Sequence, residues 1–258
     1  MNSMLQVSVL ALAFATQVPP TLQVSRGPSA DIGRLRNTEQ TGVRESAKAQ
    51  SLQQRLEDRD PDVRFLAISE MSRLAMQAGH NGSAQEKLVT EWGTFQPLLL
   101  DLLDDPDFRV RGGAARMLGF AGHWPSQQLT ARLVDRYSLE MEPGVRAVIV
   151  NVLAQRAIDV AEVQKLTTDA LQDSAVDVRR NAAQAVSRFH SPAALSRIVA
   201  ELSSGNEATR PEFVQALASY GPAAKVHVNV LENLLTVESN SERREQIRRA
   251  IAALNGKQ

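Results

Sequence analysis

The sequence predicts an all-α fold, an α-solenoid of about six antiparallel helix pairs. One short signal recurs along the chain: an acidic or proline-containing turn, an arginine that usually follows valine, and then an apolar helix. The first copy, DPDVRFLAISEMSRLA, begins at Asp60. The copies lie 31 to 47 residues apart, and repetition with such a period is typical of stacked helical repeats. With the arginine of each copy as its anchor, the anchors are Arg64, Arg111, Arg146, Arg179, Arg210 and Arg244.

The residues after each anchor have the spacing of a helix with one buried side. Positions three and seven after the anchor are apolar in all six copies, and position ten continues the stripe except at Arg156. Offsets 3, 7 and 10 share one side of an α-helix. Position eight is always small, which lets a neighbouring helix pack closely. The two wholly apolar positions hold Ala67, Ala114, Ile149, Ala182, Phe213 and Ile247, and then Met71, Leu118, Leu153, Val186, Leu217 and Ile251.

Each of these second helices is preceded by a first helix, so that one repeat is helix, short turn, helix. Pro61 and Pro143 mark the first positions of two second helices, where the missing proline N–H costs nothing. The expected N-caps are Asp60, Asn206 and Ser241, whose side chains can accept hydrogen bonds from the first turn. We expect the six first helices at 36–58, 85–104, 126–140, 158–172, 191–204 and 222–238.

The N-terminal part of the chain differs from the repeats. Residues 4–15 (MLQVSVLALAFA) are almost wholly apolar but shorter than the roughly 20 residues of a membrane-spanning helix. Their length suits the apolar core of a secretory signal peptide, and Ala13-Phe14-Ala15 has the form of a cleavage site. We therefore expect a signal peptide at 1–15, a linker at 16–37 and the repeat domain at 38–258, with export to the periplasm or the extracellular space. The alternative is a cytoplasmic chain whose apolar N-terminus docks on the domain.

Composition and motifs exclude several kinds of protein. Lys plus Arg and Asp plus Glu number 29 each, so no net charge draws the chain to nucleic acid or to an anionic membrane. The absence of cysteine excludes disulfides, thiolate metal sites and cysteine nucleophiles. No GxSxG, GxxxxGK[ST] or GxGxxG motif occurs. We expect no catalytic residue, cofactor or metal, so the sequence leans against an enzyme without deciding the question.

DPDVR followed by a small and apolar helix, recurring every thirty-odd residues, resembles HEAT repeats of the short variety found in phycobiliprotein bilin lyases. The resemblance covers about residues 45–255 and is strong at 62–64, 107–111 and 177–179. It is weaker in the last two copies, where Thr209 and Arg243 replace the valine. The resemblance implies a right-handed superhelix whose second helices line the concave face. It implies a binding scaffold and no particular chemistry.

The resemblance also implies that the anchor arginines are structural and pair with carboxylates of the same or the next repeat. This role applies to Arg64, Arg111, Arg146, Arg179 and Arg210. The alternative is a ladder of arginines that binds anions. The carboxylates expected as partners are those close in sequence: Asp60, Asp62, Asp107, Glu142, Asp177 and Glu207.

Two rows of positions on the second helices lie off the buried stripe, five and nine residues after each anchor. They are rich in Arg, Gln and Asn and contain no acidic residue, and arginine is enriched at protein interfaces. We expect these rows to bind a partner on the concave face, the alternative being an ordinary solvated surface. The expected binding residues are Arg73, Arg116, Asn151, Gln155, Gln184, Arg188 and Gln215.

The function that the sequence favours is a non-catalytic scaffold that binds a protein or peptide. The likeness to bilin lyase repeats suggests, as an alternative, a subunit that attaches or removes a tetrapyrrole. Nucleic-acid binding is less favoured because the rows offer only Phe120 as an aromatic and no carboxylate for base-excision chemistry. The sequence does not determine the identity of the partner or the oligomeric state.

If residues 1–15 are a signal peptide, the mature protein should begin near Thr16. Mass spectrometry of the native protein, recovered from the periplasm or the medium, should find this N-terminus. An intact Met1 on protein from a soluble cytoplasmic fraction would contradict export.

Overall fold

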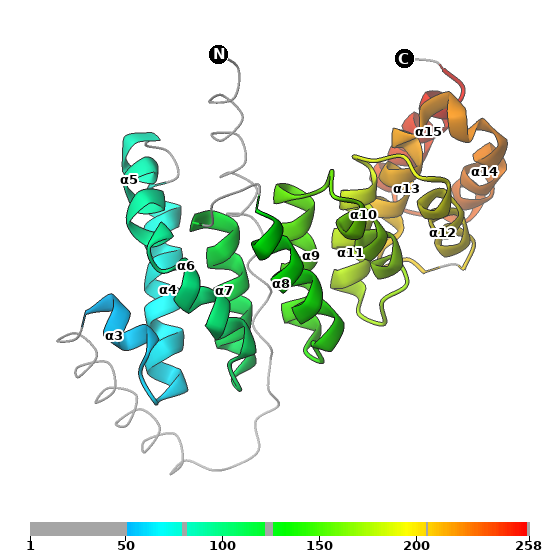
Figure 1. The fold of residues 1–258 in the computed structure, drawn as a ribbon. Coiled ribbons are helices and arrows are strands. Elements are labelled where there is room, and N and C mark those ends of the chain that lie inside the picture. Colours follow the sequence, from blue (N-terminus) through cyan, green and yellow to red (C-terminus); the bar gives the residue numbers. More distant parts are fainter. Residues whose placement is uncertain (1–50, 79–81, 122–125, 205, 257–258) are drawn as a thin grey trace, which may run out of the picture. The chain divides into compact units, whose positions relative to one another are not determined.

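A computed structural model of the chain describes residues 51–78, 82–121, 126–204 and 206–256. The predicted signal peptide and linker lie outside these residues. The described chain forms two compact units, residues 51–121 and 126–256, and each is described by itself (Figure 1). Within the described residues all regular structure is α-helix or short 3-10 helix, as the all-α prediction requires.

The first unit contains five α-helices and one 3-10 turn. The second helices of its two repeats, α4 and α7, pack against each other. The short helix α3 packs on α4, while α5, α6 and η2 cover α7. The elements are α3 (Leu52–Leu56), α4 (Pro61–Ala78), α5 (Gly82–Gly93), α6 (Gln96–Asp101), η2 (Leu102–Asp104) and α7 (Phe108–Ala121).

The second unit is a two-layered stack of helix pairs. Its second helices α9, α11, α13 and α15 pack side by side in chain order, and the first helices α8, α10, α12 and α14 each cover the second helix of their own repeat. The elements are α8 (Gln127–Leu139), α9 (Pro143–Arg156), α10 (Ala161–Ala170), α11 (Val176–Val186), α12 (Pro192–Ser203), α13 (Arg210–Ser219), η3 (Gly221–His227), α14 (Val228–Val237) and α15 (Ser241–Leu254).

The predicted stripe of the second helices is the stripe that the structure buries. All six residues three positions after the anchors are buried, and so are those seven positions after, except the half-buried Ile251 on the last helix. Arg156, the exception at offset ten, is half-buried. The period of the sequence therefore determined the orientation of each second helix about its own axis.

Two of the three expected N-caps are wrong. Asp60 accepts a hydrogen bond from the backbone N–H of Asp62, as a cap should. The cap of α13, however, is Thr209, and Asn206 instead closes a turn by accepting from the N–H of Ala208. The cap of α15 is Asn240, one residue before Ser241, and it accepts from the N–H of Arg243. Neighbouring polar residues compete for the cap, and backbone geometry decides among them.

Two of the expected first helices are broken. The helix expected at 85–104 ends at Gly93 and restarts at Gln96, because Pro97 has no N–H and its ring would clash with the carbonyl of a continuous helix four residues earlier. The helix expected at 222–238 begins as the 3-10 segment η3, whose first residue, Gly221, lies in the left-handed region at φ 54°. Of the helix expected at 36–58, the structure describes only α3.

Because α4 and α7 pack closely at Gly113, we expect glycine-to-alanine substitutions at Gly113 and at Gly144 to change the stability of the fold in opposite directions. A Cβ on Gly113 would overlap Cγ2 of Ile68, whereas a Cβ on Gly144, in the first turn of α9, meets only Glu142 Oε1 at 4.0 Å. Gly113→Ala should therefore destabilise the fold by about 1–3 kcal/mol through overpacking. Gly144→Ala should stabilise it by up to ~1 kcal/mol through the lower entropy of the unfolded chain. Urea unfolding curves measure both effects, and equal midpoints for the two variants would contradict the close packing.

Candidate partner-binding face

The anchor arginines first hold the turn of their own repeat. In four repeats Nη1 of the anchor donates to two consecutive carbonyl oxygens, six and five residues earlier, at 2.7–3.2 Å. For Arg64 these are the carbonyls of Asp58 and Arg59, and for Arg146 those of Glu140 and Met141. Because these carbonyls lie between the two helices of the pair, the arginine fixes how the second helix leaves the first.

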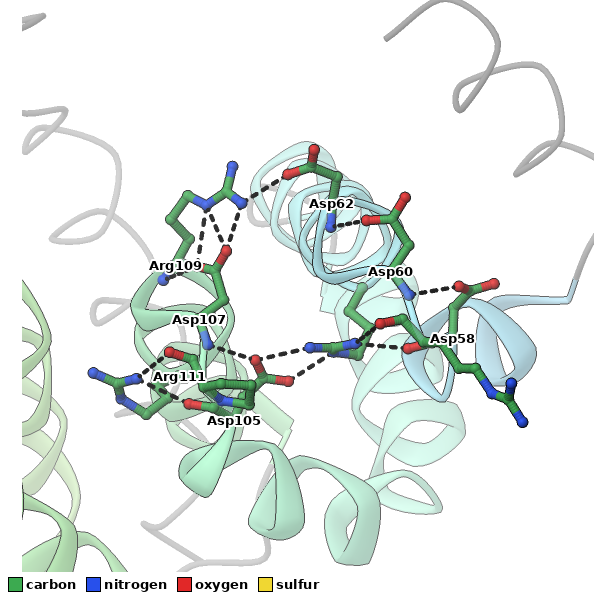
Figure 2. Close-up of polar contacts among 10 residues, drawn as sticks. Asp58, Asp60, Asp62, Asp105, Asp107, Arg109 and Arg111 are labelled. Atoms are coloured by element: carbon green, nitrogen blue, oxygen red, sulfur yellow. Dashed lines mark hydrogen bonds and ion pairs between the residues drawn. The ribbon is translucent and has the colours of Figure 1, made fainter. Parts of the chain in front are cut away.

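The same guanidinium then reaches the next repeat. Arg64 binds Asp105 through Nε and Nη2 at 2.7 and 2.9 Å, and Figure 2 shows the polar network around this carboxylate. Arg146 binds Asp173 in the same bidentate way at 2.8 Å. Two further anchors continue the pattern: Arg210 contacts Glu238 at 2.7 Å, and Nε of Arg179 lies 3.2 Å from Glu201 without an aligned hydrogen bond.

The carboxylates that pair with the anchors are not the predicted ones. Of the six expected partners only Glu207 approaches an anchor, at 3.6 Å from Arg210. Asp60 and Asp107 instead accept from backbone N–H groups at helix starts, and Asp62 binds Arg109 at 2.7 Å. The acids in or beside the first turn thus cap their own helix or bind an arginine that is not an anchor. Asp105, Asp173 and Glu238 each lie six residues before an anchor, and each pairs with the anchor of the preceding repeat. That signal is present in the sequence as Asp58, Asp105, Glu140, Asp173 and Glu238.

Two of the carboxylates that pair with anchors, Asp173 and Glu238, have lowered pKa values. Burial alone would raise the pKa of Asp173, but hydrogen bonds from Arg146 and from the N–H of Ala175 hold it below its usual range. The N–H of Asn240 and the guanidinium of Arg210 lower the pKa of Glu238. Both acids are therefore charged at neutral pH, and the ion pairs are complete.

We define the open face as the side chains five and nine positions after the anchors. The seven predicted binding residues all lie on it, and none is buried. Arg73 and Arg116 belong to α4 and α7 of the first unit. In the second unit Arg188 lies just beyond α11, and the other four belong to α9, α11 and α13. Asn151 and Gln155 are half-buried, and the remaining residues, Arg73, Arg116, Gln184, Arg188 and Gln215, are exposed.

Some of these residues also have a role within the fold. Nη1 of Arg188 donates to the carbonyl of Ala154 on the neighbouring helix at 2.7 Å, so this side chain links two repeats and is not wholly free for a partner. Gln155 donates to Asn151 at 2.7 Å, and Arg73 donates to Gln77 at 3.1 Å. Gln184 and Gln215 donate no side-chain hydrogen bond within the described residues.

Sequence reasoning missed a pair of amide links between second helices. The side-chain amide of Asn181 donates to the carbonyl of Ala147 on the preceding second helix at 2.9 Å, and that of Gln246 donates to the carbonyl of Pro211 at 2.8 Å. Each donor lies two positions after its own anchor, and each acceptor lies one position after the anchor of the preceding repeat. The equivalent residue in α7 is Gly113, where an added Cβ would overlap Ile68 of α4. Because this offset holds amide, glycine, apolar and acidic residues in different repeats, no single residue type marks it in the sequence.

The described residues contain no cluster of three metal-ligating side chains. The ring of His190 packs edge-on against Tyr220, with centroids 4.8 Å apart, while His80 and His123 lie outside the described residues. None of the described helices combines the length and the apolar character needed to cross a bilayer.

Acidification should weaken the carboxylate pairs. Since the pKa of Asp173 is lower in the folded chain than in the unfolded chain, this residue stabilises the fold above about pH 4, and the contribution is lost as the pH falls below that value. Asp173→Asn should cost on the order of 2 kcal/mol at pH 7, from lost charge-assisted hydrogen bonds. The difference from the wild type should shrink below pH 4. Urea unfolding between pH 7 and pH 2.5 measures this, and parallel curves would contradict it.

Comparison with known proteins identifies the repeat. A family model of HEAT repeats matches residues 49–154, 95–187 and 163–252, but it does not distinguish the bilin-lyase variety. No curated protein matches the chain in sequence.

Among solved structures, an engineered protein is 21% identical, with a TM-score of 0.56, over 80% of this chain and 95% of its own. A designed armadillo repeat protein in complex with the peptide (KR)4 is 20% identical, with a TM-score of 0.59, over 79% of this chain and 98% of its own. These likenesses show the fold, that of a helical-repeat solenoid. The matches to the family model span both units, and the chain belongs to the HEAT-repeat family.

Proposed function

We propose that the chain is a non-catalytic scaffold that binds a protein or peptide across the open face of its second helices. The observation that carries the proposal is the contrast between two sets of positions on the same helices. Offsets three and seven are apolar and, apart from the half-buried Ile251, buried, whereas offsets five and nine carry mainly Arg, Asn and Gln and reach solvent.

The spacing of the second helices suits an extended peptide. Packed helices lie about 8–10 Å apart, and an extended chain advances about 3.3 Å per residue. A peptide crossing from α9 to α13 would therefore meet a new helix about every three residues. Asn151, Gln184 and Gln215, on successive helices, have amides that can both donate to and accept from a peptide backbone.

The designed armadillo repeat protein supports peptide binding, because a protein of similar fold is in complex with the peptide (KR)4. That peptide is basic, whereas the open face of this chain contains arginines and no acidic residue. The likeness therefore supports peptide binding in general. It does not indicate the charge of the peptide, which has to be inferred from the side chains of this chain.

Export is part of the proposal. The apolar segment and cleavage pattern at residues 4–15 support a location in the periplasm or outside the cell. A binding scaffold needs no cofactor and can work in either place.

Selection of peptides from a random library against the whole chain tests the proposal. For a selected peptide, the double variant Gln184→Ala, Gln215→Ala should weaken binding about tenfold or more, equivalent to about 1.4 kcal/mol. Neither side chain donates a bond within the described fold, so thermal unfolding should be unchanged.

The matched control is Lys165→Ala on the first helix α10, whose side chain is 82% exposed. Binding to the control should equal that of the wild type. If Lys165→Ala abolishes binding while the double variant binds normally, the working surface is the layer of first helices and the proposal is wrong.

A further inference from the structure

We infer that the open face of the first unit binds an acidic segment of the partner, whose carboxylates are held by Arg73 and Arg116. The inference rests on the proposed function, because it names the chemistry of a peptide partner and the part of the open face that recognises its charge. Arg73 lies nine positions after its anchor on α4, and Arg116 lies five positions after its anchor on α7. Both residues are exposed, and we call them the arginine pair.

Two contacts determine how α4 and α7 lie beside each other. The hydroxyl oxygen of Ser72 lies 3.9 Å from the sulfur of Met117. One turn earlier on both helices, a Cβ added to Gly113 would overlap Ile68. In each contact the residue of α7 comes 45 positions after the residue of α4. The two helices therefore run in the same direction and keep one register.

This register places the arginine pair on one side of the two helices. Arg73 directly follows Ser72, and Arg116 directly precedes Met117. Each step along an α-helix turns the side chain by ~100°, and steps in opposite directions from two facing residues turn both side chains toward the same side. With helix axes about 8–10 Å apart and a rise of ~1.5 Å per residue, the two Cα atoms lie about 10 Å apart. Two arginine side chains with this spacing can bind one carboxylate or two carboxylates of one short segment.

The acidic residues of these two helices are already paired elsewhere. Helix α7 contains no acidic residue, and α4 contains Asp62 and Glu70. Asp62 binds Arg109 at 2.7 Å, and Glu70 binds Arg55 of α3 at 2.6 Å. No carboxylate of α4 or α7 is therefore left to neutralise the arginine pair.

The arginine pair has no carboxylate partner within the described residues. Nη1 of Arg73 donates to the neutral amide of Gln77. Although Arg116 reaches solvent, nearby protein atoms partly desolvate its guanidinium and lower its pKa, and no carboxylate raises that pKa again. Within either unit, no other adjoining open-face positions on neighbouring second helices combine two arginines. An incoming carboxylate would supply the charge-assisted hydrogen bonds that both guanidinium groups lack.

Apolar side chains border the arginine pair within the next turn of each helix. Met76 on α4 is 58% exposed. Phe120 on α7 is half-buried, and its ring packs against Trp92 with centroids 5.7 Å apart. An exposed methionine adapts to apolar partners of different shape. This border suits a segment in which acidic residues flank a large apolar residue.

The site favours the carboxylates of a peptide over the phosphates of a nucleic acid. Affinity for a nucleic acid comes from neutralising many phosphates, whereas the arginine pair supplies two charges. Sequence-tolerant binding of single strands also uses aromatic rings on which bases stack. The one aromatic residue of the first unit's open face is Phe120, and its half-buried ring already packs against Trp92.

The test measures fluorescence anisotropy of labelled peptides with the full chain at low salt. Wild-type protein should bind Ser-Gly-Glu-Phe-Glu-Gly-Ser at least about tenfold more tightly than the same peptide with Gln in place of Glu, because only the former offers charged acceptors. The peptide with Lys in place of Glu should bind least. The double variant Arg73→Gln, Arg116→Gln should lose this preference. Neither arginine bonds to another helix in the described fold, so thermal unfolding should be unchanged.

The matched control is the double variant Lys87→Gln, Arg249→Gln, which removes the same two charges. Lys87 is an exposed residue of α5 in the first unit. Arg249 lies five positions after the last anchor, on α15 of the second unit, and pairs with Glu245 at 3.3 Å. The control should keep the preference for the acidic peptide.

Several results would overturn the inference. One is equal binding of the Glu and Gln peptides, or no binding of either. Another is an equal loss of preference in the control and in the double variant of the arginine pair, which would indicate unspecific attraction. A third is tighter binding of an oligothymidylate than of the Glu peptide, with loss in the variant of the arginine pair. If peptides selected from the library depend on Gln184 and Gln215 but not on the arginine pair, the proposed function stands and only its acidic specificity fails.

Discussion

The stacking of repeats depends on the anchor arginine in the first turn of the second helix. Its guanidinium bonds at once to carbonyls of its own turn and to a carboxylate of the next repeat, as Arg64 does with Asp105 and Arg146 with Asp173. Removing either partner would leave an uncompensated charge in the interior, which is strongly unfavourable. Because each carboxylate also accepts a backbone N–H at the start of the next second helix, one ion pair orients two successive turns.

Because the anchor arginines hold the repeats together, one side of the second helices stays available for binding. It is the side that faces away from the first helices. The apolar stripe faces the first helices, and amide links such as Asn181 to Ala147 join adjacent second helices at their N-terminal ends. What remains is a row of polar side chains at regular spacing, supported by a rigid layer. Binding sites built on such helices are more precise than sites on loops, and repetition lets a partner use several weak contacts in line.

The candidate site was only partly visible in the sequence. The offsets indicated which residues reach solvent, and all seven expected residues do so. They did not indicate that Arg188 bonds to the neighbouring helix, because that contact joins residues 34 apart. Nor did the offsets explain why Arg156 is the one residue ten positions after an anchor that is not apolar or aromatic. That Nε of Arg156 is buried without a hydrogen-bond partner in the described residues depends on the surrounding atoms, which the sequence pattern does not contain.

The sequence by itself determined the all-α class, the number and order of repeats and the buried side of every second helix, because helical periodicity is local and six copies reinforce one another. Tertiary structure decided which acids pair with the anchors. Asp60 and Asp107 are nearer in sequence, yet they cap helices, while Asp105, 41 residues from Arg64, makes the buried ion pair. The reason is geometric: the direction in which a side chain points across a repeat interface depends on how two helix pairs pack, and no spacing within one repeat contains that information.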